Sequence, residues 1–318
     1  MKTELTSFRI HKRPHVDLLT ASEQQILNDF HRLYYGPAWP LVGETWHNTF
    51  WMGVNTWKCP LDLWIYQEIV WEVRPDVIVE TGTAYGGTSL FLAHLCDLIG
   101  HGKIITIDIE TKGNRPHHGR IEYLHGSSTS EEIRNQIKRR LPSNAKVIVI
   151  LDSDHSKEHV LRELMIYSEF VSTGSYIIVE DTNLNGHPVA GHHGPGPMEA
   201  VSEFLKQNRT FRIDRSREKF LMTFNPMGYL RRVGEEEFEN TSYVSRDETL
   251  GRDASKSDPL SALLEVYWTR SDLISAFPEV KDGDYKRVIQ WASDVIMNRI
   301  DAHARLKPYA DWYRTRTI

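Results

Sequence analysis

The sequence predicts an α/β protein whose doubly wound, mostly parallel seven-stranded sheet ends in an antiparallel hairpin. Three observations support this prediction. Short apolar runs alternate with segments of helical period from residue 60 to residue 207, which is typical of a parallel sheet covered on both faces. The last two apolar runs are separated only by residues 215–218, too short a connection for a parallel crossover. After Val233 the chain becomes acidic and polar, which marks the end of this domain.

The elements follow in order along residues 60–233. Pro60 suits a first helical turn, and Arg74-Pro75 ends the helix that it starts. Periodicity then predicts strands at 76–79, 103–107, 121–124, 146–151 and 176–179, with helices at 89–99, 130–141, 157–171 and 198–207. Strands at 211–214 and 219–224 are expected to form the terminal hairpin.

The segments on either side of this domain have a different texture. Residues 1–59 carry many aromatic side chains but little periodicity, so we expect an N-terminal cap over the core. Its rings either pack or line a substrate cleft. Residues 234–258 contain an acidic cluster and small polar side chains and are predicted to be a linker. Apolar positions at helical spacing then predict a small helical appendage at residues 259–318.

Composition argues against several classes of function. The 318 residues carry a net charge of -5 and show no basic stripe, so a nucleic-acid partner is not expected. No apolar run approaches the roughly 18 residues of a membrane span, and Met1 to Val16 lacks the apolar core of a secretory signal. Cys59 and Cys96 have neither metal nor redox spacing, so we expect two buried thiols in a reducing cytoplasm. A homo-oligomer is left open.

A glycine-rich turn follows the first strand of the domain, in the stretch Glu80-Thr-Gly-Thr-Ala-Tyr-Gly-Gly-Thr-Ser89. Glycines at a strand-to-helix turn let the backbone approach a ligand, and the helix start offers unpaired N–H groups. The spacing is wider than that of a dinucleotide site. The acid before the first glycine would repel a pyrophosphate but suits the ammonium of a methionine moiety. We therefore expect S-adenosylmethionine as cofactor, bound by Glu80, Gly82, Thr83, Tyr85, Gly86 and Ser89; the alternative is a tight turn without a ligand.

Three further positions extend this cofactor site along the same edge of the sheet. Asp108 ends the second strand, where an acid bonds ribose hydroxyls in nucleotide-binding sheets. Ser127 follows the third strand, where the adenine would lie. Asp152 ends the fourth strand and borders both this site and the acid cluster that follows.

Acidic side chains converge at the ends of the fourth and fifth strands. Asp152 ends one strand, and Glu180 with Asp181 ends the next. Because such acids repel one another without a cation, and because oxygen ligands suit Mg²⁺, with Mn²⁺ as an alternative, these three residues are predicted metal ligands. The competing interpretation is that they cap helices. His155 lies three residues after Asp152 and is either the general base or a bystander; the additional acid Asp154 has no assigned role.

These stretches together resemble the cephalosporin hydroxylase family, whose members have the methyltransferase variant of the Rossmann-like fold. The matching stretches are the glycine turn, Leu151-Asp-Ser-Asp-His, Val179-Glu-Asp, Trp57-Lys-Cys-Pro-Leu-Asp62, Gly194-Pro-Gly-Pro-Met-Glu-Ala200 and Asn225-Pro-Met-Gly-Tyr-Leu-Arg231. The resemblance covers roughly residues 45–233. It implies S-adenosylmethionine as cofactor, Mg²⁺ bound by Asp152, Glu180 and Asp181, and His155 as the base. The family is similar to macrolide-sugar O-methyltransferases, and the tail around Tyr267-Trp268 resembles a helical module of bacterial glycan-biosynthesis enzymes.

The predicted function is an S-adenosylmethionine-dependent O-methyltransferase that acts on a sugar hydroxyl in a glycosylated natural product or bacterial glycan. An NAD-dependent oxidoreductase is the rival enzyme, against which the glycine spacing and the terminal hairpin argue. A non-catalytic ligand-binding or scaffold subunit is the third alternative, although a scaffold gains nothing from crowded acids. The loop Asn185 to Pro197, with His187, His192 and His193, is predicted to be a mobile lid.

Overall fold

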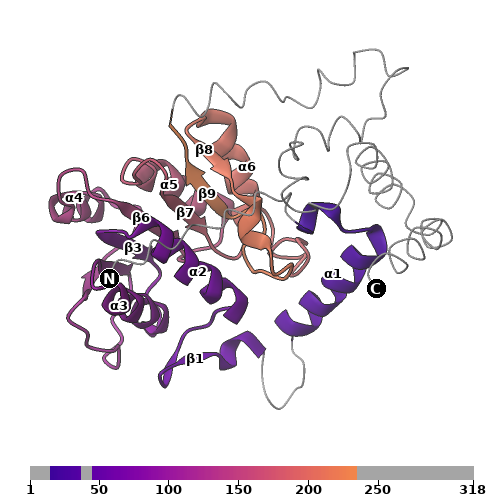
Figure 1. The fold of residues 1–318 in the computed structure, drawn as a ribbon, viewed down its shortest axis with the longest axis horizontal. Coiled ribbons are helices and arrows are strands. Elements are labelled where there is room, and N and C mark those ends of the chain that lie inside the picture. Colours follow the sequence, from indigo (N-terminus) through magenta and orange to yellow (C-terminus); the bar gives the residue numbers. More distant parts are fainter. Residues whose placement is uncertain (1–14, 37–44, 235–318) are drawn as a thin grey trace, which may run out of the picture. The chain divides into compact units, whose positions relative to one another are not determined.

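The computed structural model describes residues 15–36 and 45–234 (Figure 1). The strands of the main sheet are β3 (Val77–Thr81), β4 (Lys103–Asp108), β5 (Ile121–His125), β6 (Val147–Leu151), β7 (Tyr176–Val179), β8 (Phe211–Ile213) and β9 (Tyr229–Arg232). The helices that cover it are α2 (Pro60–Val73), α3 (Gly87–Ile99), α4 (Glu131–Arg140), α5 (Lys157–Tyr167) and α6 (Pro197–Gln207).

The seven strands form one sheet in the order β5-β4-β3-β6-β7-β9-β8. Strands β3 to β7 pair in parallel, whereas β9 is antiparallel to both of its neighbours, β7 and β8. The predicted doubly wound, mostly parallel sheet with an antiparallel end is therefore confirmed. The chain order reverses between β3 and β6, and this reversal is the place where open α/β sheets bind their ligands.

Helices cover both faces of this sheet (Figure 1), with α4, α5 and α6 on one face and α2 and α3 on the other. Successive side chains of a strand point to opposite faces. Val77 and Val79 pack with α4, α5 and α6, whereas Ile78 between them packs with α2 and α3. Every residue of β3 and of β6 is buried as a result. This double burial explains why the strands appear in the sequence as continuous apolar runs.

Helix ends follow local capping signals. Helix α4 begins after Ser130 because the Ser130 hydroxyl accepts a hydrogen bond from the Ile133 amide. Helix α5 ends at Tyr167, four residues before the predicted end at residue 171. The Phe170 amide donates to the Tyr167 carbonyl in a tight turn, and the buried side chains of Phe170 and Val171 continued the apolar period beyond the helix.

The prediction of a strand at residues 219–224 is wrong. The partner of β8 is β9, and the short helix η3 (Arg215–Glu218) lies in the connection between them. In the predicted segment, Met222 and Phe224 pack in a small cluster around Cys59, and the Phe224 amide donates to Asp62 of α2 at 2.8 Å. The apolar pattern thus reflects packing under the N-terminal segment instead of a β-ladder.

The N-terminal segment contains more regular structure than its sequence predicted. It forms the short helices η1 (His15–Leu18) and η2 (Thr45–Asn48), the longer α1 (Ala21–Tyr35), and a small hairpin of β1 (Phe50–Trp51) and β2 (Val54–Asn55). Thr20 and Glu23 form a capping box at the start of α1, a sequence signal that the periodicity analysis left unused. His31 on α1 stacks on Phe224 with ring centroids 5.6 Å apart.

The linker predicted at 234–258, apart from Gly234, and the appendage predicted at 259–318 lie outside the described residues, so both stay predictions. Among the residues that are described, no helix is long and apolar enough to cross a membrane. Cys59 and Cys96 are both buried and free, as expected.

Candidate active site

A pocket lies at the carboxyl edge of the sheet, where the neighbouring strands β3 and β6 end. Its walls come from the glycine turn after β3, from the end of β6 and from the N-terminal segment. Of the predicted cofactor residues, Gly82, Thr83, Tyr85 and Asp152 line it. The opposite wall is formed by Asn55, Thr56 and Trp57, of which only Trp57 was considered as a cleft residue.

Two glycines of the turn are required by close approaches of the chain to itself. Gly82 has φ +84°, and a Cβ atom there would lie 1.7 Å from the Asp152 carbonyl oxygen. A Cβ atom at Gly87 would lie 2.2 Å from the Asn55 carbonyl oxygen. The pocket therefore depends on these glycines for its shape, whatever ligand it takes.

Glu80 lies beneath this turn and is only 1% exposed. The hydroxyls of Ser89 and Thr106 both donate to its Oε2 atom, the latter at 2.7 Å. Burial raises the pKa of Glu80 to about 7, although the two hydrogen bonds act in the opposite direction. Ser89 is fully buried, and its hydroxyl bonds to Glu80 below the turn.

Asp108, at the end of β4, forms a hydrogen bond with the backbone of the glycine turn. Its Oδ2 atom accepts hydrogen bonds from the Ala84 amide at 2.9 Å and from Arg115 at 2.7 Å. Gly86 precedes α3 as its N-cap with φ +81°, and a Cβ atom there would lie 2.9 Å from Pro116. The roles predicted for Asp108 at the ribose and for Ser127 at the adenine stay predictions.

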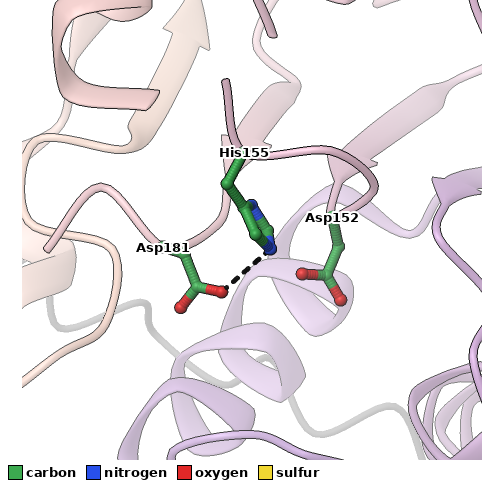
Figure 2. Close-up of side chains that lie close together, drawn as sticks. All are labelled: Asp152, His155 and Asp181. Atoms are coloured by element: carbon green, nitrogen blue, oxygen red, sulfur yellow. Dashed lines mark ion pairs between the residues drawn. The ribbon is translucent and has the colours of Figure 1, made fainter. Parts of the chain in front are cut away.

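Two acids and a histidine meet beside the pocket. Figure 2 shows the imidazole of His155 between the carboxylates of Asp152 and Asp181. The candidate ligand atoms of the three side chains all lie within 4.8 Å of one another, and His155 Nε2 is 3.2 Å from Asp181 Oδ2. Burial raises the pKa of both carboxyl groups. A cation would offset this cost of burying charge, so the donor set fits a divalent metal ion.

The third predicted ligand, Glu180, bonds to residues outside this cluster. Its side chain is 2% exposed, and its Oε1 atom accepts hydrogen bonds from the Tyr66 hydroxyl and, at 3.1 Å, from Lys58. Burial raises the pKa of Glu180 as well. The structure thus places Glu180 at the same strand end as Asp181, but its carboxylate bonds to Tyr66 and Lys58 and does not belong to the group formed by Asp152, His155 and Asp181.

Two residues that sequence reasoning missed position these acids. Asp181 has φ +54°, in the left-handed region, and its amide donates to Asn225 Oδ1 at 3.0 Å. The Nδ2 group of Asn225 donates to the Tyr66 hydroxyl at 3.0 Å. Asn225 therefore links the backbone of Asp181 to the hydroxyl that serves Glu180. The only sequence signal for Asn225 was the stretch Asn225-Pro-Met-Gly, which was noted because it resembles the cephalosporin hydroxylase family.

Lys58 was also missed, although it touches the cluster directly. Its side chain is 5% exposed, and its ammonium lies 2.5 Å from Asp152 Oδ2. Burial by itself would lower the pKa of Lys58, but Asp152 and Glu180 outweigh it and hold that pKa well above its usual value. The lysine is therefore charged. Lys58 lies in the stretch Trp57-Lys-Cys-Pro-Leu-Asp62, which was noted for its resemblance without a role for the lysine.

Asp154 and the predicted lid lie beside the cluster. Asp154 accepts a hydrogen bond from the Ser156 amide at 2.7 Å, at the start of α5, and the hydrogen bonds with Ser156 lower its pKa. In the lid, His187 and Asn185 both bond to Glu199 of α6, at 2.8 and 3.1 Å. Burial alone would raise the pKa of Glu199, but hydrogen bonds lower it to about 2. Motion of this loop stays a prediction.

Asp152 borders both the pocket and the acid cluster. A molecule bound in the pocket would therefore lie next to a partly buried group of two carboxylates and an imidazole. This arrangement can orient a hydroxyl, neutralise its developing charge and accept its proton.

Comparison with known proteins identifies the sequences to which this chain is similar. A sequence model of a family described as Rhamnosyl O-methyltransferase/CmcI matches residues 43–233. Rhamnosyl O-methyltransferase of Mycobacterium tuberculosis is 38% identical over 214 residues, which cover 65% of this chain and 85% of the relative. The protein of the same name from Mycobacterium leprae is 37% identical, with 65% and 90% covered. A solved structure described as the CmcI-N160 apo-structure has a TM-score of 0.47 at 22% identity, covering 64% of this chain and 83% of that one.

Proposed function

Because the chain belongs to the Rhamnosyl O-methyltransferase/CmcI family and is an S-adenosylmethionine-dependent O-methyltransferase, we propose that it methylates a hydroxyl of a sugar. In this proposal Asp152, Glu180 and Asp181 hold Mg²⁺, with Mn²⁺ as an alternative, and His155 is the general base. The observation that supports it best is the position of Asp152, which borders both the pocket and the acid cluster. The names of the relatives favour a rhamnosyl-type acceptor.

The pocket binds the cofactor in this proposal. Glu80 pairs with the ammonium of the methionine moiety, through a carboxylate that Ser89 and Thr106 orient from below. Asp108 bonds the ribose hydroxyls, and Ser127 lies at the adenine. The turn after β3 lines the pocket and, through Gly82, brings its backbone against the end of β6, so the two halves of the site are held at a fixed separation.

The acid cluster places and activates the acceptor. When bound, a divalent cation supplies Lewis acidity that lowers the pKa of an acceptor hydroxyl. Asp181 orients the imidazole of His155 through the contact at 3.2 Å. As the acceptor oxygen bonds to the methyl carbon of the sulfonium, the bond from that carbon to sulfur breaks and leaves a neutral thioether. The hydroxyl proton passes to His155, and a general base in this position contributes roughly 10² to 10⁴ in rate.

The acceptor is then a small molecule or glycan that carries a free sugar hydroxyl. We also propose that the enzyme works in a reducing cytoplasm, a proposal supported by the two free, buried cysteines. Assembly into a homo-oligomer stays a prediction.

The test combines turnover with chelation. Purified protein incubated with S-adenosylmethionine and a rhamnosyl-bearing acceptor should give a product that is heavier by one methyl-for-hydrogen exchange. Turnover should disappear in EDTA and return when excess Mg²⁺ is added. Undiminished turnover in a thoroughly chelated sample would contradict the metal part of the proposal. Binding of NAD in place of S-adenosylmethionine would favour an oxidoreductase, and cofactor binding without turnover on any sugar acceptor would favour a scaffold.

A further inference from the structure

The acid cluster contains its own positive charge. Three carboxylates lie at two neighbouring strand ends: Glu180 is buried, and Asp152 and Asp181 are partly buried. Lys58 reaches them from the residues just before α2, with its ammonium 2.5 Å from Asp152 and 3.1 Å from Glu180. A buried ion pair of this kind fixes geometry because every partner left without its counter-charge is costly. Lys58 therefore holds the carboxylates of two strands together.

The side chains of this cluster have a defined net charge. Counted at their formal charges, three carboxylates and one ammonium sum to two negative charges. That remainder equals the charge of one divalent cation. We propose that Lys58 is a permanent cation of the metal site. It sets the net charge of the site to match one divalent ion and thereby weakens metal binding. This inference rests on the proposed Mg²⁺ site.

Two consequences follow from electrostatics alone. The repulsion between the ammonium and a bound metal ion is proportional to the charge of that ion. Removal of the lysine charge should therefore strengthen the binding of a divalent ion, and it should strengthen the binding of a trivalent ion more. In the absence of metal the same change removes the ammonium that pairs with Asp152 and with the buried Glu180, so the metal-free protein should become less stable.

The experiment measures metal binding to the full-length protein by calorimetry, with Mg²⁺ and Tb³⁺ as probes. Lys58→Gln and Lys58→Met remove the charge, Lys58→Arg keeps it, and Lys219→Gln removes a lysine that pairs with Glu68 elsewhere. We expect Mg²⁺ to bind Lys58→Gln at least about tenfold more tightly than the wild type. The gain for Tb³⁺ should be larger, by about three to two on a logarithmic scale. Lys58→Arg and Lys219→Gln should stay near the wild type.

Thermal unfolding gives a second readout. In EDTA, Lys58→Gln should unfold at a lower temperature than the wild type, and Mg²⁺ should raise its midpoint by more than it raises the wild-type midpoint. Should both neutral variants fold only when Mg²⁺ or Tb³⁺ is present, the metal has replaced the lysine charge, as the inference requires.

Several results would overturn the inference. One is an unchanged or weakened Mg²⁺ affinity in a folded neutral variant, and another is an equal gain in affinity for the two ions. A third is that the neutral variants stay unfolded in both metals, because Lys58 would then supply a contact that no cation replaces. The wild type separates this failure from that of the metal site. If the wild type binds no Mg²⁺, the proposed metal site is itself wrong.

Discussion

Glu80 should make the affinity for S-adenosylmethionine depend on pH. Burial raises its pKa to about 7, so the free enzyme carries a largely protonated Glu80 in mild acid. The cofactor ammonium pairs with the ionised form only. Affinity should therefore rise with pH up to about 7 and gain more than about tenfold between about pH 5.5 and 7, since the ionised fraction grows from a few per cent to one half. Above about pH 8 the amino group of the cofactor itself loses its proton.

The assay is calorimetric titration across this range, with 5′-methylthioadenosine as a matched ligand that lacks the amino-acid moiety. Replacing Glu80 with Gln should flatten the pH dependence for S-adenosylmethionine and weaken its binding at pH 7. The loss should be about 10- to 150-fold, because a hydrogen bond to a charged group contributes about 1.5–3 kcal/mol. The methylthioadenosine affinity should change little with pH or mutation. A wild-type affinity that is flat between pH 5.5 and 7, or an unaltered slope in Glu80→Gln, would refute the pairing.

Two further predictions address the base and the glycine turn. His155→Ala should lower kcat by about 10² to 10⁴ while cofactor affinity is retained; a near-normal kcat, equal to that of His192→Ala in the lid, would place the base elsewhere. Gly82→Ala should lower stability by more than about 4 kcal/mol, because its Cβ overlaps the Asp152 carbonyl. Gly174→Ala, which has the same positive φ but open space around it, should lose only about 1–2 kcal/mol, and equal losses in thermal or urea unfolding would contradict this account.

The order of the elements could be predicted because burial on both faces leaves an unbroken signal. The first three residues of β3 and all of β6 are apolar and buried, Pro75 and Gly82 separate β3 from the neighbouring helices, and Pro142 precedes β6. The same reasoning failed at residues 219–224. An apolar run there packs against Cys59 instead of pairing in a sheet, and local periodicity does not distinguish these two kinds of burial.

The site was predictable where it depends on strand ends and hidden where it depends on distant segments. Parallel strands bring their carboxyl ends to one edge, so Asp152 and Asp181 could be placed near each other from the strand pattern. Lys58, in contrast, is 94 residues from Asp152 in the chain, and Tyr66 is 114 residues from Glu180. No local pattern encodes such a pairing. The chemistry of three converging acids indicates that partners exist but does not identify them.

The position of β9 between β7 and β8 affects the order in which the site can be assembled during synthesis. Chains emerge from the ribosome N-terminus first, so β7 and Asp181 are made well before Asn225 and β9. Until residues 225–232 are available, β7 has no partner on its outer edge, and the Asp181 amide lacks the Asn225 side-chain oxygen to which it donates. A nascent chain that ends near residue 210 would thus contain every acid of the cluster without the framework to place them. The geometry of the cluster and the closing of the sheet therefore depend on the same late segment of the chain.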